Sequence, residues 1–234
     1  MYDIAYFFRN KYIVSIEKND ELSFVIRTTQ ADIDFEKCLA EREAIRRGYS
    51  QKFYFPGYLE AIAINRHIAT NMLAYDTFLM HGSVIAKDGV AYMFTACSGV
   101  GKSTRTRLWL NLYPSSFVIN GDKPLIKITD TEAIACGTPW CGKEGLNTDV
   151  MLPLKVIFLL ERTDEGEESS IEEICFEKGF PILLQQTYRP ENPELLRKTL
   201  FLLKALNRKV KIYRFRSEPT EESVRMAYEV ARPS

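Results

Sequence analysis

The feature that most constrains the fold is the segment ACSGVGKST at residues 96–104. It fits the phosphate-loop pattern G-x-x-x-x-G-K-[ST], with Ala96 in the place of the usual first glycine. The β-rich run Tyr92-Met93-Phe94 precedes the segment, and a helical pattern from Arg105 to Leu112 follows it. A strand that passes through glycines into a helix is typical of α/β proteins, so the sequence predicts an α/β core around this loop.

The residue types in the loop match the requirements of a bound phosphate chain. Gly99 and Gly101 permit the backbone angles that turn successive N–H groups toward an anion, and the following helix adds partial positive charge at its N-terminus. We expect Lys102 to reach the β- and γ-phosphates and the Ser103 hydroxyl to ligate Mg²⁺. The alternative interpretation is a glycine-rich turn with a surface lysine. The predicted nucleotide-binding residues are Ser98, Gly99, Val100, Gly101, Lys102, Ser103 and Thr104.

Length and charge limit the classes of function. The chain has 234 residues, enough for one large domain with a small appendage. Lys and Arg together number 31, as do Asp and Glu, so no broad attraction to nucleic acid or to an acidic membrane is expected. No apolar run approaches the roughly 20 residues of a membrane span, and the start of the chain is unlike a signal peptide. The five cysteines form no CxxC motif, which predicts reduced thiols in a cytoplasmic protein.

The chain divides into two predicted parts. Residues 1–56 form a small β-rich N-terminal region, with strands at 12–16 and 24–26 and a charged helix at 36–47. Residues 57–234 form the larger domain, which opens with a predicted helix at 59–79. Its other predicted elements are strands at 83–86, 90–95, 117–119, 125–128, 156–160 and 210–215, a solvated loop at 164–173, and helices at 103–112, within 176–207 and at 220–231.

Four short motifs occur in a fixed order: His81-Gly82-Ser83, the hairpin turn Asp88-Gly89, the phosphate loop, and Asn120-Gly121-Asp122-Lys123. Together they resemble the catalytic domain of HPr kinase/phosphorylase, which shares its nucleotide-binding core with phosphoenolpyruvate carboxykinases. More narrowly, the chain resembles short HPr-kinase-like proteins, some of which phosphorylate peptides. The resemblance covers His81 to Lys123 closely and the later element order loosely, while the segment before Tyr58 has no match. It implies a mixed-sheet P-loop core with C-terminal helices, together with ATP, Mg²⁺ and phosphoryl transfer to a serine hydroxyl.

The resemblance gives Asp122 a particular weight. In the kinase family two adjacent aspartates follow the strand after the phosphate-loop helix, one as the base toward the hydroxyl and one as a metal ligand. Here Gly121 replaces the first, so the resemblance implies Asp122 and Ser103 as metal ligands, with Asp122 or Glu144 as the base. The alternative for Asp122 is a turn aspartate, because Asn-Gly-Asp is good turn chemistry. His81 matches a family histidine near the phosphates, with a structural strand-end histidine as the alternative.

The glycine-rich loop at 137–145 holds Trp140, Lys143 and Glu144. A loop with several glycines loses much conformational entropy when it becomes ordered, so its contacts must compensate for this loss. We therefore expect the loop to line the site, with Lys143 at the γ-phosphate and Glu144 near the acceptor. A packed loop with a chance charge pair is the alternative. The family has a different signature here, so neither HPr as the substrate nor the reverse phosphorylase reaction follows from the resemblance.

The sequence therefore predicts an ATP- and Mg²⁺-dependent kinase that acts on a Ser or Thr hydroxyl of a peptide or protein. Two alternatives stay open: a nucleotide-binding regulator in which Gly121 marks a dead site, and a carboxykinase-like enzyme acting on a small acid. The predicted partners are a nucleotide and a hydroxyl acceptor, with neither nucleic acid nor membrane. Formation of a homo-oligomer is left open.

Overall fold

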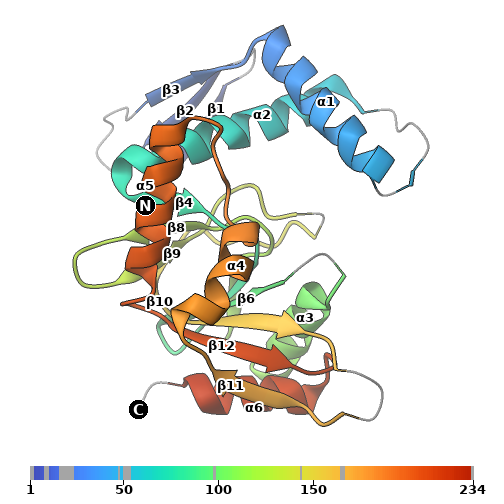
Figure 1. The fold of residues 1–234 in the computed structure, drawn as a ribbon, viewed down its shortest axis with the longest axis vertical. Helices are drawn as coiled ribbons and strands as arrows, with labels where there is room; N and C mark the ends of the chain where they lie inside the picture. The colour runs from blue at the N-terminus through green and yellow to red at the C-terminus, as the bar shows by residue number, and fades with distance from the viewer. Residues whose placement is uncertain are drawn as a thin grey trace. The chain divides into compact units, whose positions relative to one another are not determined.

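The computed structural model describes residues 3–7, 11–15, 24–46, 48–49, 54–96, 99–142, 144–163 and 167–232. These residues form two compact units, Met1–Asn71 and Met72–Ser234, whose elements are drawn in Figure 1. Helix α2 (Pro56–Asn71) packs against α1 (Gln30–Arg46) and thus belongs to the first unit. The boundary predicted at 56/57 falls after the first residue of this helix.

The first unit joins a small sheet to two helices. Strands β1 (Asp3–Phe7), β2 (Lys11–Ser15) and β3 (Phe24–Arg27) form an antiparallel sheet in chain order. The two predicted strands fall on β2 and β3, and residue 16 lies outside the described residues. Helix α1 begins at Gln30, earlier than the predicted start at residue 36, because Thr29 and Asp32 form an N-terminal cap: Thr29 N donates to Asp32 Oδ2 at 2.9 Å.

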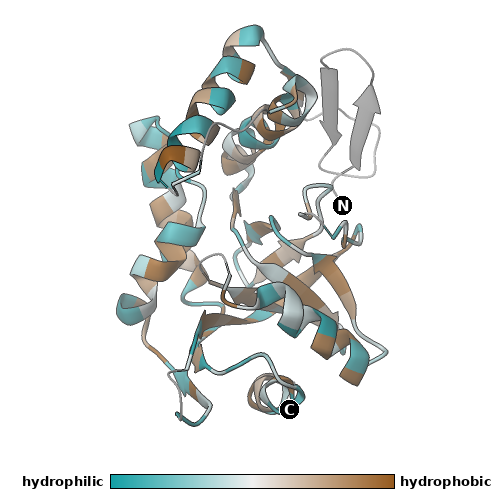
Figure 2. Cartoon of the chain, turned by 90° about the vertical axis from the view of Figure 1, so that its right-hand side faces the viewer, coloured by the Kyte–Doolittle hydropathy of each residue, from teal (hydrophilic) through white to brown (hydrophobic). Residues whose placement is uncertain are grey.

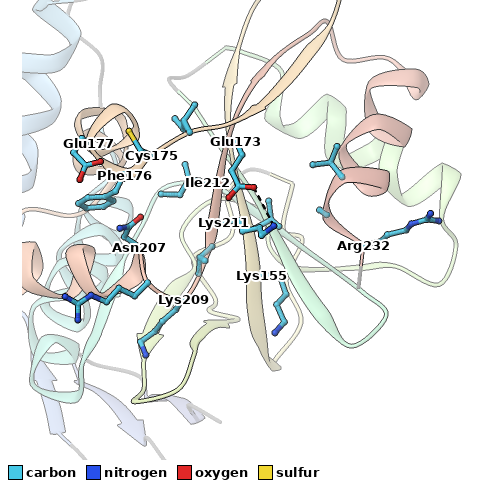
Figure 3. A pocket seen from close by; sticks show the side chains of 16 residues that line it. Lys155, Glu173, Cys175, Phe176, Glu177, Asn207, Lys209, Lys211, Ile212 and Arg232 are labelled. Carbon is cyan, nitrogen blue, oxygen red and sulfur yellow. Dashed lines mark ion pairs between the residues drawn. The ribbon is translucent and has the colours of Figure 1, made fainter. Parts of the chain in front are cut away.

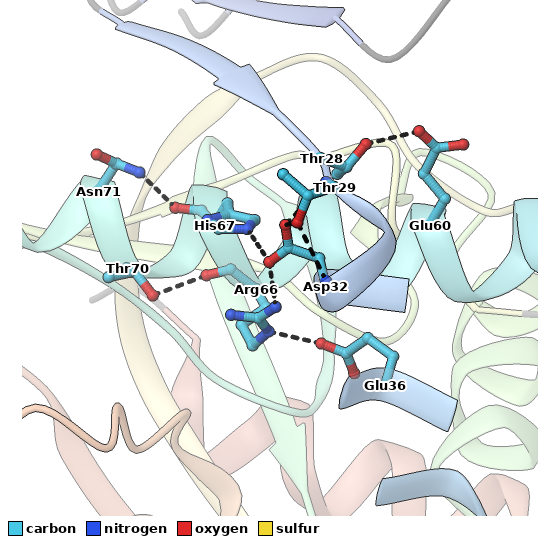
Figure 4. Close-up of polar contacts among 9 residues, drawn as sticks. All are labelled: Thr28, Thr29, Asp32, Glu36, Glu60, Arg66, His67, Thr70 and Asn71. Atoms are coloured by element: carbon cyan, nitrogen blue, oxygen red, sulfur yellow. Dashed lines mark hydrogen bonds and ion pairs between the residues drawn. The ribbon is translucent and has the colours of Figure 1, made fainter. Parts of the chain in front are cut away.

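A charged cluster ties the two helices of this unit together (Figure 4). Arg66 on α2 reaches Asp32 Oδ1 at 2.9 Å and Glu36 Oε1 at 2.6 Å, and His67 Nε2 lies 2.7 Å from the same Asp32 oxygen. Burial by itself raises the pKa of Asp32, but hydrogen bonds from Thr29, His67 and Arg66 outweigh it and hold this pKa well below its usual range. The ionised carboxylate therefore anchors α1 to α2.

The second unit is built on a mixed sheet. Its longest path runs β4-β8-β9-β10-β6-β5-β7, with β12 paired to β10 and β11 paired to β12. Strands β6, β10 and β12 are parallel to one another, and the other pairs are antiparallel. The strands are β4 (Thr77–Leu79), β5 (Ser83–Lys87), β6 (Val90–Thr95), β7 (Phe117–Asn120), β8 (Leu125–Ile128), β9 (Ala133–Cys136), β10 (Met151–Glu161), β11 (Ser170–Glu173) and β12 (Lys211–Arg216).

Helices cover both faces of this sheet. The side chains of β6 alternate between the two faces, so this one strand contributes to the core on each side. Met93 packs in a core cluster with residues of α4 (Phe176–Gln186) and α5 (Pro193–Leu206). Tyr92 and Phe94 pack with residues of α3 (Lys102–Leu112) and α6 (Glu221–Ala231), including Trp109. Figure 2 shows the matching hydropathy: the strands are mostly apolar, and the helices are banded with polar residues. The prediction of an α/β fold with a mixed sheet is confirmed at this level.

Local predictions in the second unit mostly hold. The Asp88-Gly89 hairpin joins β5 to β6, with both residues at positive φ, 54° and 75°. The all-apolar run at 156–160 is a buried central strand, paired with β6 and β12. Among the described residues, no helix is long and apolar enough to cross a membrane.

Two predictions are wrong. The helix expected at 59–79 ends at Asn71, and after a 3₁₀ turn at Met72–Tyr75 and a positive φ of 52° at Asp76, residues 77–79 form β4. Pairing of β4 with β8 supplies backbone hydrogen bonds that local sequence does not reveal. The loop expected at 164–173 contains the edge strand β11, which pairs with β12, while residues 164–166 lie outside the described residues.

Candidate active site

The carboxyl ends of the three parallel strands meet at one edge of the sheet. β6 ends at Thr95, which is in register with Leu159 of β10, and Glu161 of β10 is in register with Arg216 of β12. The glycine-rich segment leaves β6 at this edge and leads directly into α3. The strand and the helix that flank the predicted phosphate loop are therefore present, while Ser98 lies outside the described residues.

The described part of the loop has the backbone angles that its glycines favour. Gly99 and Gly101 have φ values of 88° and 94°, in the left-handed region. Gly101 is also the N-cap of α3 and supplies no side-chain cap, so the first N–H groups of the helix are not covered by a capping side chain. Val100 packs against the core, whereas Ser103 and Thr104 are exposed on the first turn of α3.

Two cationic side chains contact the loop backbone. Lys102 Nζ donates to Ala96 O at 2.8 Å. Arg162, directly after β10, donates through Nη2 to Gly99 O at 2.6 Å. Two positive charges thus contact the loop backbone, at Ala96 and at Gly99, close in sequence to the N-terminus of α3.

His81 and Asp122, which are distant in sequence, meet near this lysine. His81 Nε2 lies 3.3 Å from Asp122 Oδ1, and Gly82 N donates to Asp122 O at 2.9 Å. Burial raises the pKa of Asp122, but the bond from His81 and the charges of His81, Lys123 and Lys102 outweigh it, so that the pKa is lowered. The Asp122 carboxylate is therefore ionised at neutral pH and lies within the electrostatic reach of Lys102.

Asn120 builds the turn that carries Asp122. Its Oδ1 accepts hydrogen bonds from Asp122 N at 2.9 Å and Lys123 N at 2.7 Å. Its Nδ2 donates to Thr138 Oγ1 at 2.8 Å, which connects the turn to the loop at 137–145. Because Asn120 makes the turn bonds, the Asp122 side chain is left to face His81.

The loop at 137–145 packs on the same turn. A Cβ added at Gly142 would lie 3.0 Å from Asp122 Cβ, which shows how closely this loop approaches Asp122. Glu144 Oε1 forms an ion pair with Arg107 of α3 at 2.6 Å. Glu144 is thereby tied to the exposed face of α3, and Lys143 lies outside the described residues.

Gly121 has no room for a side chain. A Cβ there would lie 2.9 Å from Cys141 O and 3.4 Å from Leu146 O, while Gly121 N donates to Leu146 O at 3.0 Å. The backbone of the 137–146 segment therefore fills the space in which a carboxylate at position 121 would begin.

We predict that Gly121→Asp lowers the free energy of unfolding by about 1–3 kcal/mol and does not raise activity, because the new side chain overpacks the loop. Urea denaturation measures the change. Gly57→Asp is the matched control, since a Cβ at Gly57 meets nothing within 4 Å. Unchanged stability of the Gly121→Asp variant would contradict this account of the loop.

The sequence did not reveal the contribution of two further residues. Gln186, at the end of α4, accepts from His81 N at 2.7 Å through its carbonyl and lies 2.8 Å from His81 Nδ1 through Oε1. Arg105 belongs to α3 and its side chain is fully buried, with Nη2 donating to Ser217 Oγ at 2.6 Å. Burial lowers the pKa of Arg105 to about 10, although the negative charge of Glu218 acts in the opposite direction. The 105 positions that separate His81 from Gln186 explain why no sequence motif could indicate the pair.

A cavity of about 670 Å³ lies elsewhere in the same unit (Figure 3). Its walls include Lys155 of β10 and Lys211 of β12, near the amino-terminal parts of these parallel strands, and Lys211 lies 3.5 Å from Glu173. The phosphate loop follows the opposite, carboxyl end of the same strand set. The cavity is therefore separate from the His81–Asp122 site.

Comparison with known proteins adds a distant likeness of fold. No family model matches the chain, and no curated protein matches its sequence. A solved structure of the Hpr(Ser) kinase/phosphatase from Coxiella burnetii is similar over 65% of this chain and 93% of its own, with 8% sequence identity and a TM-score of 0.37. A likeness at this level does not bear on the chemistry of the site.

Proposed function

We propose that this protein is an ATP- and Mg²⁺-dependent kinase that transfers the γ-phosphate to a hydroxyl group, in the class of Ser or Thr residues of a peptide or protein. The observation that carries the proposal is the meeting of three groups: the glycine loop that leads into α3, Lys102, and the ionised Asp122 held by His81. Phosphoryl transfer needs an anion cradle, a cation and a carboxylate in this relation. The acceptor class comes from the resemblance of the sequence motifs.

The residues also fit Mg²⁺. Within the described residues, no group of three or more His, Cys, Asp or Glu side chains gathers to hold a metal ion. Mg²⁺ at phosphoryl-transfer sites takes one or two protein oxygens in addition to the phosphates of the substrate, and the Asp122 carboxylate and the Ser103 hydroxyl are oxygens of this kind. Ser103 and Asp122 would hold the ion, which would neutralise charge on the phosphates.

In the proposed reaction, loop amides and Lys102 hold the β- and γ-phosphates in line with the acceptor. The acceptor oxygen forms a bond to the γ-phosphorus while the bond from that phosphorus to the bridging oxygen of ADP breaks. The hydroxyl proton passes to Asp122, which His81 keeps in position. Glu144 is engaged with Arg107, so Asp122 is the better candidate for the base.

Transfer of label from γ-labelled ATP to a Ser/Thr peptide library tests the proposal. We expect Mg²⁺-dependent label on serine or threonine. Binding of ATP without transfer to any acceptor would instead support the nucleotide-binding regulator, an alternative favoured by the filled space at Gly121. Label on a small carboxylic acid would overturn the kinase assignment in favour of carboxykinase-like chemistry.

A further inference from the structure

Arg105 is a fully buried cation beside the phosphate loop, and its side-chain hydrogen bonds reach one short connection. Nη2 donates to Ser217 Oγ at 2.6 Å, to Ser217 O at 3.2 Å and to Glu218 O at 3.2 Å. These acceptors lie between β12 and α6, and α6 packs beside α3 (Figure 1). The arginine therefore joins the first turn of α3 to the connection at residues 217–219.

The same connection packs on the phosphate loop. A Cβ added at Gly101 would lie 3.3 Å from Cγ and 3.6 Å from Cβ of Pro219, so the proline ring covers the open side of this glycine. Ser217 N donates to Glu161 O, which ties the connection to the end of β10. Gly101 has its positive φ of 94° where this ring meets the loop.

Stability alone does not account for a charge in this place. Nε and Nη1 of Arg105 are buried without a hydrogen-bond partner among the described residues. The acceptors of Nη2 are a hydroxyl and two carbonyls, so none of these bonds supplies a negative charge. The guanidinium also lies over the Phe215 ring, with Cζ 4.7 Å from its centroid. An apolar side chain would fill this space with a smaller desolvation penalty, but it could not hold the connection.

We propose that Arg105 is a positioning residue that holds residues 217–219 against Gly101 and thereby keeps the phosphate loop in its anion-binding shape. A glycine can adopt many conformations, and the packed Pro219 ring removes part of that freedom before a ligand arrives. Affinity scales with the fraction of molecules whose loop is competent to bind. The restraint is a property of the free protein, whereas its effect on ATP rests on the proposed function.

Amide hydrogen exchange tests the restraint without any ligand. Arg105→Met removes the charge and the donors but keeps a long side chain over Phe215. We expect faster exchange in the first turn of α3 and at Ser217, unchanged exchange in β10, and a melting temperature that is unchanged or higher. Arg225→Met, the same change at an exposed position of α6, is the matched control, with no change expected.

Two results of this experiment would overturn the proposal. One is unchanged exchange at Ser217 and in the first turn of α3. The other is an Arg105→Met variant that does not fold, or that melts at a lower temperature with faster exchange throughout the second unit. The arginine would then serve general stability.

Nucleotide affinity tests the consequence for the loop. Arg105→Met is expected to raise both the Kd and the KM for ATP about tenfold and to leave kcat at saturating ATP within about twofold. Pro219→Ala removes the ring atoms nearest to Gly101, and we expect a rise in Kd of similar size. Because both residues act through one contact, the double variant should bind no more weakly than the weaker single variant. Effects that multiply to about a hundredfold would contradict the shared contact and overturn the proposal.

The two measurements separate this proposal from the proposed function. Faster local exchange in Arg105→Met, with no ATP binding even in the wild type, would support the restraint and refute the kinase. Wild-type affinity for ATP in Arg105→Met would refute the positioning role and leave the kinase standing.

Discussion

Lys102→Ala is expected to raise the Kd for ATP by a factor of about 10²–10⁴. Each charge-assisted bond from the lysine to a phosphate contributes about 1.5–3 kcal/mol, and two phosphates lie within the reach expected of this side chain. In the free protein, Nζ donates to Ala96 O, a contact that ties the lysine to the start of the loop. Calorimetric titration with ATP and Mg²⁺ measures the affinity, and phosphoryl transfer should be lost together with binding.

The control for this variant is Lys155→Ala. Lys155 lines the cavity near the other end of the parallel strands, so its removal deletes the same charge away from the phosphate loop. We expect wild-type affinity in the control and an unchanged melting temperature in both variants. Wild-type affinity in Lys102→Ala would remove this loop from nucleotide binding and with it the basis of the proposed kinase.

Elements with a strong local signal were predictable from the sequence. The Asp88-Gly89 turn needs two residues at positive φ, which these residue types tolerate, and the run at 156–160 is too short and too apolar for a surface helix. The helix predicted at 59–79 failed because Thr77–Leu79 gains its strand conformation from β8, about 50 residues later. Pairing of this kind is set by the whole sheet and leaves no local pattern.

The candidate site also combines features that have a local signal in the sequence with features that depend on distant contacts. The glycines of the loop and the presence of Asp122 could be read from motifs, since each has a local chemical reason. The packing role of Gly121 could not be predicted from the sequence, because the atoms that fill its side-chain position belong to Cys141 and Leu146. Gly121 and the glycine-rich loop at 137–145 are separate features of the sequence, and in the structure they form one packing arrangement. Gln186 had no motif at all, because its contact with His81 arises from the pairing of residues 79–81 with 186–188.

Asp122→Asn is expected to lower kcat about 10³-fold while the Kd for ATP changes by less than about threefold. The loop amides and Lys102 hold the phosphates in either case, and the amide oxygen of asparagine can still ligate Mg²⁺, so the affinity for ATP depends little on the charge at this position. Asparagine keeps the shape of the side chain but cannot take the proton of the acceptor hydroxyl. Single-turnover transfer to a peptide acceptor measures the loss, and Asp130→Asn, the same change at an exposed position, is the control.

The pH dependence of the wild type gives an independent check of the same residue. Because the pKa of Asp122 is lowered by His81, Lys123 and Lys102 against the effect of burial, the base is ionised above that lowered value and is lost as the pH falls through it. The rate should therefore stay high well into mildly acid buffer and fall at a pH below the usual range of a carboxyl group. Asp122→Asn should lack this acid limb while keeping its low residual rate. Equal turnover in Asp122→Asn and the wild type would exclude Asp122 as the base, and a carboxylate elsewhere would then have to take the proton.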